Sequence, residues 1–242
     1  MTAWLLAALE SARETLEHDE DAQGYLLGRG MQDHVIEEMG VGVWSPPEAD
    51  APDAVFRDRY GDNGWKLRGR LVVPFYSPRG KVIGFEARSM TDKNATRHLL
   101  VEAAWNPVFI GCGMATPKVW DGGNVWLVEG LFDMTAMLRI VPEEDAVLAT
   151  VRAKVSDKHL EYLRRFCKGM VYVVYDNDET GRKQTTGWTD DKTGKFRWGA
   201  IQRLERVGLP CHDARYRGGK DPGEIWEKTG TSGLQQAFAH IL

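Results

Sequence analysis

Four carboxylates follow apolar runs or lie in a turn, at positions that favour a common chemical site. Two apolar β-type runs, 124–128 and 170–175, each lead into acidic residues, and another acid lies in a Gly-Lys-Asp-Pro turn. The acids are Glu129, Asp176, Asp178 and Asp221. Carboxylates at the carboxyl ends of buried parallel strands converge in the crevice where open α/β sheets bind ligands. Oxygen ligands gathered there suit Mg²⁺ or Mn²⁺, hard ions that bind phosphates, so the spacing predicts metal-dependent phosphoryl chemistry.

Each of these carboxylates could bind a metal or take part in catalysis, or it could only be solvated in a turn or cap a helix. Asp176 and Asp178 are two residues apart, so on a strand their side chains face the same side and can reach one metal cluster. The alternative is a turn with solvated carboxylates. Glu129 could ligate a metal, act as a general base towards a 3′-hydroxyl, or lie favourably at a helix N-terminus. Asp221 precedes Pro222, which also makes it a candidate N-cap.

The elements that would position these residues alternate between strands and helices after residue 123. Strands are expected near 124–128, 146–151 and 170–175, and helices near 131–140, 156–167, 198–207 and 233–242, with Ser156 as an N-cap. This alternation implies a mainly parallel sheet covered on both faces. The upstream chain predicts a helix at 2–17, two short helices within 20–40 broken at Gly28-Arg29-Gly30, a loop at 44–64, and β-runs with turns from 71 to about 109.

The formal net charge of −4 conceals a segregation of charge along the chain. Residues 1–62 hold 4 Lys or Arg against 14 Asp or Glu, whereas residues 63–128 hold 9 against 4. A basic segment beside a carboxylate cluster is what a nucleotide or nucleic-acid site needs, because phosphate neutralisation dominates such binding. The alternative is an ordinary solvated basic surface.

Cysteine usage and hydropathy narrow the class of protein. The three scattered cysteines, Cys112, Cys167 and Cys211, argue for a reducing compartment and against a disulfide framework. Because no Cys-x-x-Cys pair exists, a structural zinc site is not expected. Apolar runs fall short of the roughly 18 residues of a membrane span. We therefore expect a cytoplasmic protein without a membrane partner.

Taken in order, the motifs resemble those of the Toprim domain and of the basic subdomain that precedes it in bacterial and phage primases. The Toprim-like motifs are Glu129-Gly130-x-x-Asp133, Asp176-Asn177-Asp178 followed by Gly181-Arg182, and Lys220-Asp221-Pro222. The upstream motifs are Tyr25-Leu26-Leu27-x-Arg29-Gly30, Arg70-Leu71-Val72-Val73-Pro74-Phe75, Arg79-Gly80-Lys81-Val82-Ile83-Gly84-Phe85 and Arg88. A lone Glu-Gly or Asp-x-Asp is weak, but the ordered set extends from about residue 20 to 230.

The resemblance implies a DnaG-type primase catalytic core. Such a core is a DNA-dependent RNA polymerase that makes short RNA primers on single-stranded DNA from ribonucleoside triphosphates, using Mg²⁺ or Mn²⁺. The implied fold is an α+β N-terminal basic subdomain followed by an α/β Toprim domain, whose mainly parallel sheet has helices on both faces. The expected parts are a helical segment and loop at 1–62, the basic subdomain at 63–122, and the Toprim domain at 123–242 with an inserted hairpin at about 183–197. The resemblance also implies a location in the cytoplasm of a bacterium or of a phage-infected host cell. It further implies a replicative helicase or a separate zinc-binding chain as a partner.

The resemblance also extends the set of candidate site residues. Asp133 matches an acid of the family's metal site, which would complete the set with Glu129, Asp176, Asp178 and Asp221. Catalysis is expected from Glu129, Asp176 and Asp178. Arg182 and Lys220 are expected to meet phosphates. Contacts to template or triphosphate are expected from a basic set upstream: Arg70, Arg79, Lys81, Arg88 and Arg97.

Several features depart from the family pattern and keep alternatives open. The chain lacks the cysteines of the family's zinc-binding module, so that module is expected on another chain or not at all. An acid usual in the family falls on Gly218, and Arg152-Ala153 replaces a usual Gly-Thr. The alternatives are a Toprim nuclease and a catalytically degenerate replisome or nucleic-acid-binding adaptor.

The expected insertion at 183–197 raises a separate question. It carries Trp188 and Phe196 around a polar turn and is followed by Trp198. These aromatic side chains could stack on nucleic-acid bases or pack on the protein itself.

Overall fold

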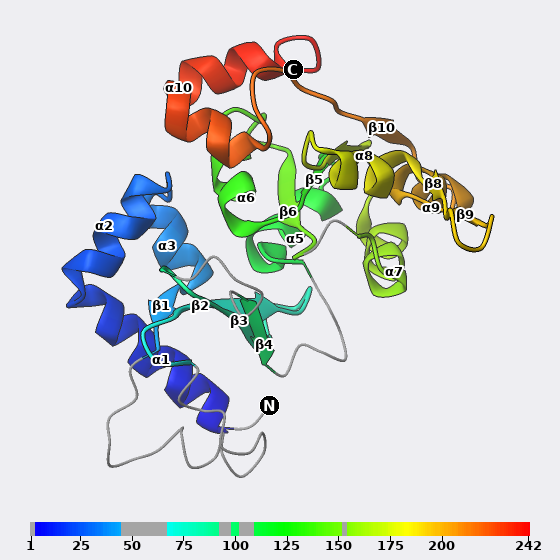
Figure 1. Cartoon of the computed structure of the whole chain (residues 1–242). Coiled ribbons are helices and arrows are strands. Elements are labelled where there is room, and N and C mark those ends of the chain that lie inside the picture. Colours follow the sequence, from blue (N-terminus) through cyan, green and yellow to red (C-terminus); the bar gives the residue numbers. More distant parts are fainter. Residues whose placement is uncertain (1–2, 45–66, 92–97, 102–108, 152–153) are drawn as a thin grey trace. The chain divides into compact units, whose positions relative to one another are not determined.

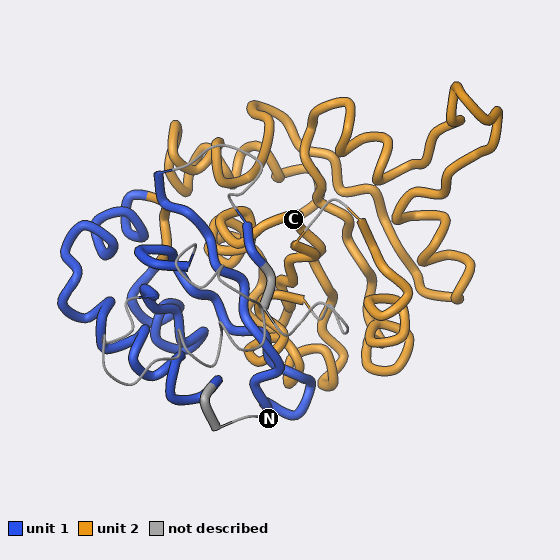
Figure 2. The backbone as a smooth tube through the Cα atoms, turned by 60° about the horizontal axis from the view of Figure 1, so that its bottom comes forward, with its two compact units in different colours: residues 1–28, 32–106 blue, residues 29–31, 107–242 orange. Residues whose placement is uncertain are grey.

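The computed structural model describes residues 3–44, 67–91, 98–101, 109–151 and 154–242. By its internal contacts the chain divides into two compact units, which are coloured separately in Figure 2. Unit 1 comprises residues 1–28 and 32–106, and unit 2 comprises residues 29–31 and 107–242. The expected loop at 44–64 lies almost entirely outside the described residues.

Unit 1 begins with helices whose apolar spacing was readable in the sequence. These are α1 (Ala3–Glu17), α2 (Glu20–Gly28) and α3 (Asp33–Met39). On α1 the buried side chains are Leu5, Ala8, Leu9, Ala12 and Leu16, which recur at the three- and four-residue spacing of one helical face. The break between α2 and α3 falls at Gly28-Arg29-Gly30, as expected.

Besides these helices, unit 1 contains an antiparallel sheet of order β1-β2-β3-β4 (Figure 1). Its strands are β1 (Gly42–Val43), β2 (Leu71–Tyr76), β3 (Val82–Arg88) and β4 (His98–Val101). The predicted turn joins β2 to β3, where Ser77 N donates to Lys81 O over 2.8 Å. Gly42 has no room for a side chain, since a Cβ there would lie 2.4 Å from the backbone of Ala12. The backbone of β1 therefore packs directly on α1.

Unit 2 contains a fully parallel sheet of order β10-β7-β5-β6. Its strands are β5 (Val125–Val128), β6 (Ala146–Ala149), β7 (Val171–Val174) and β10 (Cys211–Asp213). The side chains of β5 and β6 are buried throughout, as expected for strands covered on both faces.

The helices of unit 2 lie on both faces of this sheet. They are α5 (Cys112–Trp120), α6 (Leu131–Met137), α7 (Asp157–Phe166), α8 (Glu179–Thr186), α9 (Ala200–Arg206) and α10 (Pro222–Phe238). The chain steps from β5 to β6 in one direction and from β6 back to β7 in the other. Because such crossovers are right-handed, α6 lies on the opposite face from α7. The expected architecture, an α+β unit followed by an α/β unit whose parallel sheet has helices on both faces, is confirmed.

Several elements differ from those expected from sequence. Helices α5 and α8 and the short edge strand β10 were not foreseen. Helices were expected to begin at Pro222 and to cover 233–242. The structure has one helix, α10, which begins at Pro222, is broken at Gly230 (φ 68°) and ends at Phe238. Gly230 interrupts the helix because its left-handed backbone conformation is one that glycine adopts without strain. Along the described ranges, no helix combines the length and apolar character needed to traverse a membrane.

Candidate active site

Two of the predicted carboxylates lie side by side because their strands are neighbours. Strands β5 and β7 run parallel, with Val128 paired to Val174, so their carboxyl ends meet at the same edge of the sheet. Glu129 follows β5 and Asp176 follows β7. The backbone N–H of Asp176 donates to Oε1 of Glu129 over 3.0 Å. One carboxylate is thereby oriented by the turn that carries the other.

Asp178 is fixed by the helix that follows it. It is the N-cap of α8, and its Oδ1 accepts a hydrogen bond from Gly181 N over 2.9 Å. The turn is tight, since a Cβ on Gly181 would lie 2.0 Å from the carbonyl oxygen of Asp176. Glycine at 181 therefore allows the helix to start directly over the two aspartates.

Asp133 and Asp221 complete the acidic cluster from the other side. Asp133 lies in the first turn of α6, and its Oδ1 accepts from the backbone of Gly223 over 3.2 Å. Asp221 is the N-cap of α10, with Oδ1 accepting from Glu224 N over 2.7 Å. The capping role considered for Asp221 is thus present, and it holds the Asp221 carboxylate close to Asp133.

Lys220 connects the two halves of the cluster. Its Nζ lies 3.1 Å from Oδ2 of Asp176 and 3.4 Å from Oδ2 of Asp178. The same loop is tied to the aspartate turn through the backbone, because Asn177 N donates to Lys220 O over 2.6 Å. Tyr216 adds a further hydrogen bond, with its hydroxyl donating to Lys220 O over 2.8 Å.

The electrostatics of the cluster are those of closely spaced like charges. Burial, followed by the charge of Asp176, raises the pKa of Glu129 to about 7. Burial and the neighbouring Asp221 also raise the pKa of Asp133. The hydrogen bond from Gly181 N lowers the pKa of Asp178, and the hydrogen bond to Asp176 raises the pKa of Lys220. Lys220 therefore only partly offsets the mutual repulsion of these carboxylates.

The donor set has the chemistry of a hard-metal site, although the side chains are not arranged around an ion. Within the described parts of the chain, no three Asp, Glu, His or Cys side chains are placed so that they could hold a metal ion. All donors of the cluster are carboxylate oxygens, which Mg²⁺ and Mn²⁺ prefer. The ammonium group of Lys220 already marks a position between Asp176 and Asp178 where positive charge is favourable.

The predicted basic residues fall into two groups. Arg182 lies at the acidic cluster, where its Nη2 donates to Asn177 O over 2.9 Å. The others belong to unit 1: Arg70 precedes β2, Arg79 and Lys81 are exposed around the β2–β3 turn, and Arg88 is buried at the end of β3. Arg97 lies outside the described residues, as does the Arg152-Ala153 pair.

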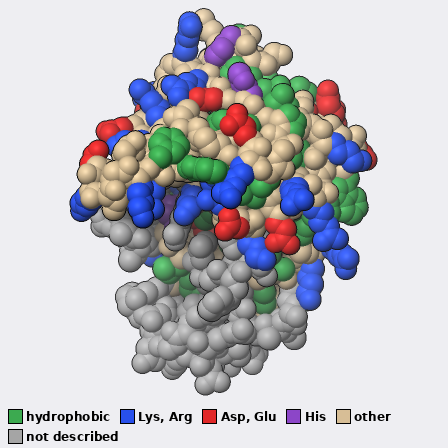
Figure 3. All heavy atoms as spheres, turned by 90° about the vertical axis from the view of Figure 1, so that its right-hand side faces the viewer, with side chains coloured by type: hydrophobic (Ala, Val, Ile, Leu, Met, Phe, Trp, Pro, Cys, Tyr) green, Lys and Arg blue, Asp and Glu red, His purple; other side chains and the backbone are tan. Residues whose placement is uncertain are grey.

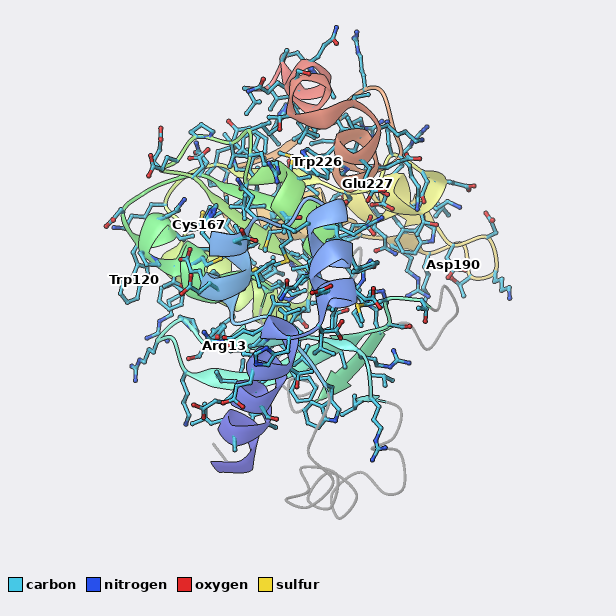
Figure 4. The ribbon with its side chains drawn as sticks, turned by 90° about the vertical axis from the view of Figure 1, so that its left-hand side faces the viewer. Arg13, Trp120, Cys167, Asp190, Trp226 and Glu227 are labelled. Atoms are coloured by element: carbon cyan, nitrogen blue, oxygen red, sulfur yellow. The ribbon has the colours of Figure 1, made fainter. Side chains whose placement is uncertain are left out.

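Residues 29–31 brace the helices that carry Asp133 and Asp221, although they are distant in sequence. Arg29 forms an ion pair with Glu227 of 2.5 Å, and its guanidinium lies 4.5 Å from the ring centre of Phe132. Arg139 on the other side donates to Gly30 O over 2.8 Å. Figure 4 shows Trp226 and Glu227 on α10, the helix that receives these contacts. Sequence reasoning placed Arg29-Gly30 in a family motif but gave no signal for these partners.

Residues 126–225, which include most of the parallel sheet and all five carboxylates of the acidic cluster, match the model of the Toprim-like family. Beyond that segment, most of the chain is similar to bacterial primases. Over 252 aligned residues the chain is 26% identical to a DNA primase of Aquifex aeolicus. The alignment covers 93% of this chain and 46% of that protein. The chain thus spans about half the length of this curated relative.

Solved primase structures have the same fold. The zinc-binding and RNA polymerase domains of the Aquifex aeolicus primase superpose with a TM-score of 0.72 at 21% identity, covering 98% of this chain and 60% of that one. A DnaG primase catalytic domain bound to single-stranded DNA gives a TM-score of 0.69 at 19% identity, covering 98% and 77%. The expected resemblance to a DnaG-type primase catalytic core is confirmed.

Proposed function

We propose that this chain is a primase catalytic core, which joins ribonucleotides into short RNA primers on single-stranded DNA by divalent-metal-dependent nucleotidyl transfer. The observation that carries the proposal is the convergence of five carboxylates at one edge of a parallel sheet, in a chain similar to primases through both of its units. Nucleotidyl transfer requires mainly that phosphates be positioned and their charge neutralised.

The acidic cluster supplies the ligands for the ion. Asp176 and Asp178, with Glu129, Asp133 and Asp221 around them, would hold Mg²⁺ or Mn²⁺ once Lys220 releases its two aspartates. When bound, such ions neutralise phosphate charge and stabilise the attacking and leaving oxygens of the transfer. Glu129, whose pKa of about 7 lies near neutrality, is suited to accept a proton from a primer 3′-hydroxyl.

Cationic side chains would bind the phosphates. Lys220 and Arg182 lie at the acidic cluster and would meet the triphosphate of an incoming ribonucleotide. Arg70, Arg79, Lys81, Arg88 and Arg97 are the proposed template or triphosphate contacts in unit 1. Single-stranded DNA as the template is supported by the relative whose catalytic domain was solved with it. A zinc-binding module on another chain and a replicative helicase are the proposed protein partners, and the cytoplasm the proposed compartment.

The test is primer synthesis by wild type and by carboxylate variants. The protein is incubated with single-stranded DNA, labelled ribonucleotides and Mg²⁺ or Mn²⁺, and the products are separated on a gel. We expect short labelled products from wild type, and a loss of at least about 100-fold from Asp176→Ala and Asp178→Ala, because the metal ligands are removed. Circular dichroism should show a retained fold in the Asp176→Ala protein.

Other outcomes would replace the proposal. Shortened DNA without labelled primers would identify a nuclease. Unchanged DNA and no primers, with a primase zinc-binding module supplied in trans, would identify an adaptor. Full synthesis by Asp176→Ala would show that the acidic cluster is not the catalytic site.

A further inference from the structure

A short hairpin leaves the parallel sheet of unit 2 directly after α8. It is formed by β8 (Trp188–Thr189) and β9 (Phe196–Arg197), which pair antiparallel. Asp190 fixes its turn, since Oδ1 accepts from the backbone of Lys192 and Thr193 over 3.0 and 3.1 Å. Figure 4 shows Asp190 in this loop, away from the helices of the sheet. The hairpin is therefore a defined structure that projects from the unit.

A cavity of about 350 Å³ lies at the base of this hairpin. Its lining combines aromatic, basic and amide side chains: Lys154, Gln184, Trp188, Phe196, Arg197, Trp198 and Arg203. Two of the aromatic residues remain largely open to solvent, with 51% of Phe196 and 46% of Trp198 exposed. Packing on the protein therefore leaves about half of each residue available for another contact.

The charged side chains that line the cavity are all cationic. Arg197 and Arg203 are held in place by ion pairs to Asp190 and Asp157, of 3.1 and 2.5 Å, while none of the described residues in the lining is acidic. Arg206 adds a guanidinium that lies 4.8 Å from the ring centre of Trp198. Figure 3 views unit 2 from the hairpin side and shows apolar side chains among Lys and Arg side chains.

We propose that this hairpin cavity is a binding site for single-stranded nucleic acid. Bases stack on the exposed faces of Phe196 and Trp198, and the adjacent phosphates are met by Lys154, Arg197 and Arg203. The combination of exposed aromatic rings with a cationic lining fits a nucleic-acid strand better than an apolar protein segment, which would offer the lining cations no anionic group.

The cavity and the acidic cluster lie at opposite ends of the same helix, α8. Helix α8 begins at the Asp178 N-cap and leads directly into β8, so its eight residues separate the two sites by about 12 Å. The proposed site rests on the proposed function, because it gives a nucleic-acid strand at the acidic cluster a second point of attachment. Binding itself requires no catalysis and is measured separately.

The test compares two matched surface tryptophans. Binding of a fluorescein-labelled oligothymidylate is followed by anisotropy at low salt, without nucleotides or metal. Trp198→Ala and Phe196→Ala should each weaken binding at least about fivefold, the loss of one stacked base. Trp120→Ala is the control, because Trp120 is 49% exposed in the same unit but does not line the cavity. Thermal melting checks that all three variants are folded.

A second measurement addresses charge and location. Lys154→Ala should reduce the slope of log affinity against log salt by about one, as expected for one phosphate contact. An oligonucleotide carrying a photoreactive uracil should crosslink to residues 188–198. Equal affinity of Trp198→Ala and Trp120→Ala, with no crosslink at the hairpin, would overturn the inference. That result alongside normal primer synthesis would leave the proposed function intact.

Discussion

At the scale of single residues, Lys220 is the unusual member of the acidic cluster. Its ammonium group spans Asp176 and Asp178 at 3.1 and 3.4 Å, where a metal ion would compete with it. Ammonium and a hard dication cannot share these oxygens without repulsion. In the proposed function, Lys220 would therefore compensate the two aspartates until an ion binds, and it would then be free to bind a phosphate.

This competition predicts how the protein responds to metal. Lys220→Met removes the charge but keeps most of the stem, so Mg²⁺ and Mn²⁺ should bind more tightly and raise the melting temperature of the variant more than that of wild type. Lys228→Met is the matched control, since Lys228 pairs with Glu224 and not with Asp176 or Asp178. An equal or smaller metal-induced shift in Lys220→Met would contradict a shared site.

At the scale of elements, the N-terminus of α7 contains a buried histidine. Ser156 caps the helix, and the backbone N–H of Ser156 donates to Nδ1 of His159 over 3.2 Å. The imidazole stacks on Phe109 with 4.2 Å between ring centres. Burial lowers the pKa of His159 to about 4, because the charged form would lose its hydration.

A pH dependence of stability follows. The unfolded chain binds a proton at His159 near pH 6.5, while the folded chain does so only near pH 4. Protonation of His159 therefore does not reduce the free energy of unfolding above pH 6.5. As the pH falls from 6.5 towards 4, the free energy of unfolding decreases by up to about 3 kcal/mol. Urea unfolding of wild type and His159→Gln across this range measures it. The free energy of unfolding of the variant should decline less, and parallel curves would refute the assignment.

Elements with a strong local pattern were predictable, and those fixed by distant partners were not. The apolar run of β7 and the Ser156 cap carry their own signals, as does the spacing on α1. Helix α8 has few apolar residues and depends on the Asp178 cap and on the close approach of Gly181 to Asp176. Strand β10 is short and becomes a strand only through its pairing with β7.

The same division holds for the site. The expected positions of the strand ends indicated where Glu129 and Asp176 would lie, because parallel strands end at a common edge of the sheet. The positions of Lys220 and Arg29 could not be predicted, since each depends on a loop or helix far away in the sequence. The aromatic residues of the hairpin were visible in the sequence, but their exposure was not.

At the scale of the whole molecule, the chain enters unit 2 twice. Residues 29–31 belong to it, although the segments on either side of them belong to unit 1. Gly30 has a φ of 80°, and a Cβ there would lie 2.7 Å from the ring of Trp226. A short stretch near the amino end is thus an integral part of the unit that carries the carboxylates.

Gly30→Ala should therefore destabilise the protein by about 1–3 kcal/mol, through backbone strain and the clash with Trp226. Thermal or denaturant unfolding measures the loss. Gly24→Ala is the control, because Gly24 lies within α2 and nothing approaches a Cβ there. That change should be neutral or slightly stabilising. Equal stabilities of the two variants would show that the contact with Trp226 is unimportant.

The ion pair between Arg29 and Glu227 also bears on how the protein is made. Its two partners leave the ribosome far apart in time, since roughly 200 residues separate them, and contacts of such long sequence separation form late in folding. Until α10 has been synthesised, α6 lacks the helix that packs against it and Arg29 lacks its ion-pair partner. A nascent chain stalled before Pro222 should therefore hold the carboxylate-bearing half in an immature, protease-sensitive state.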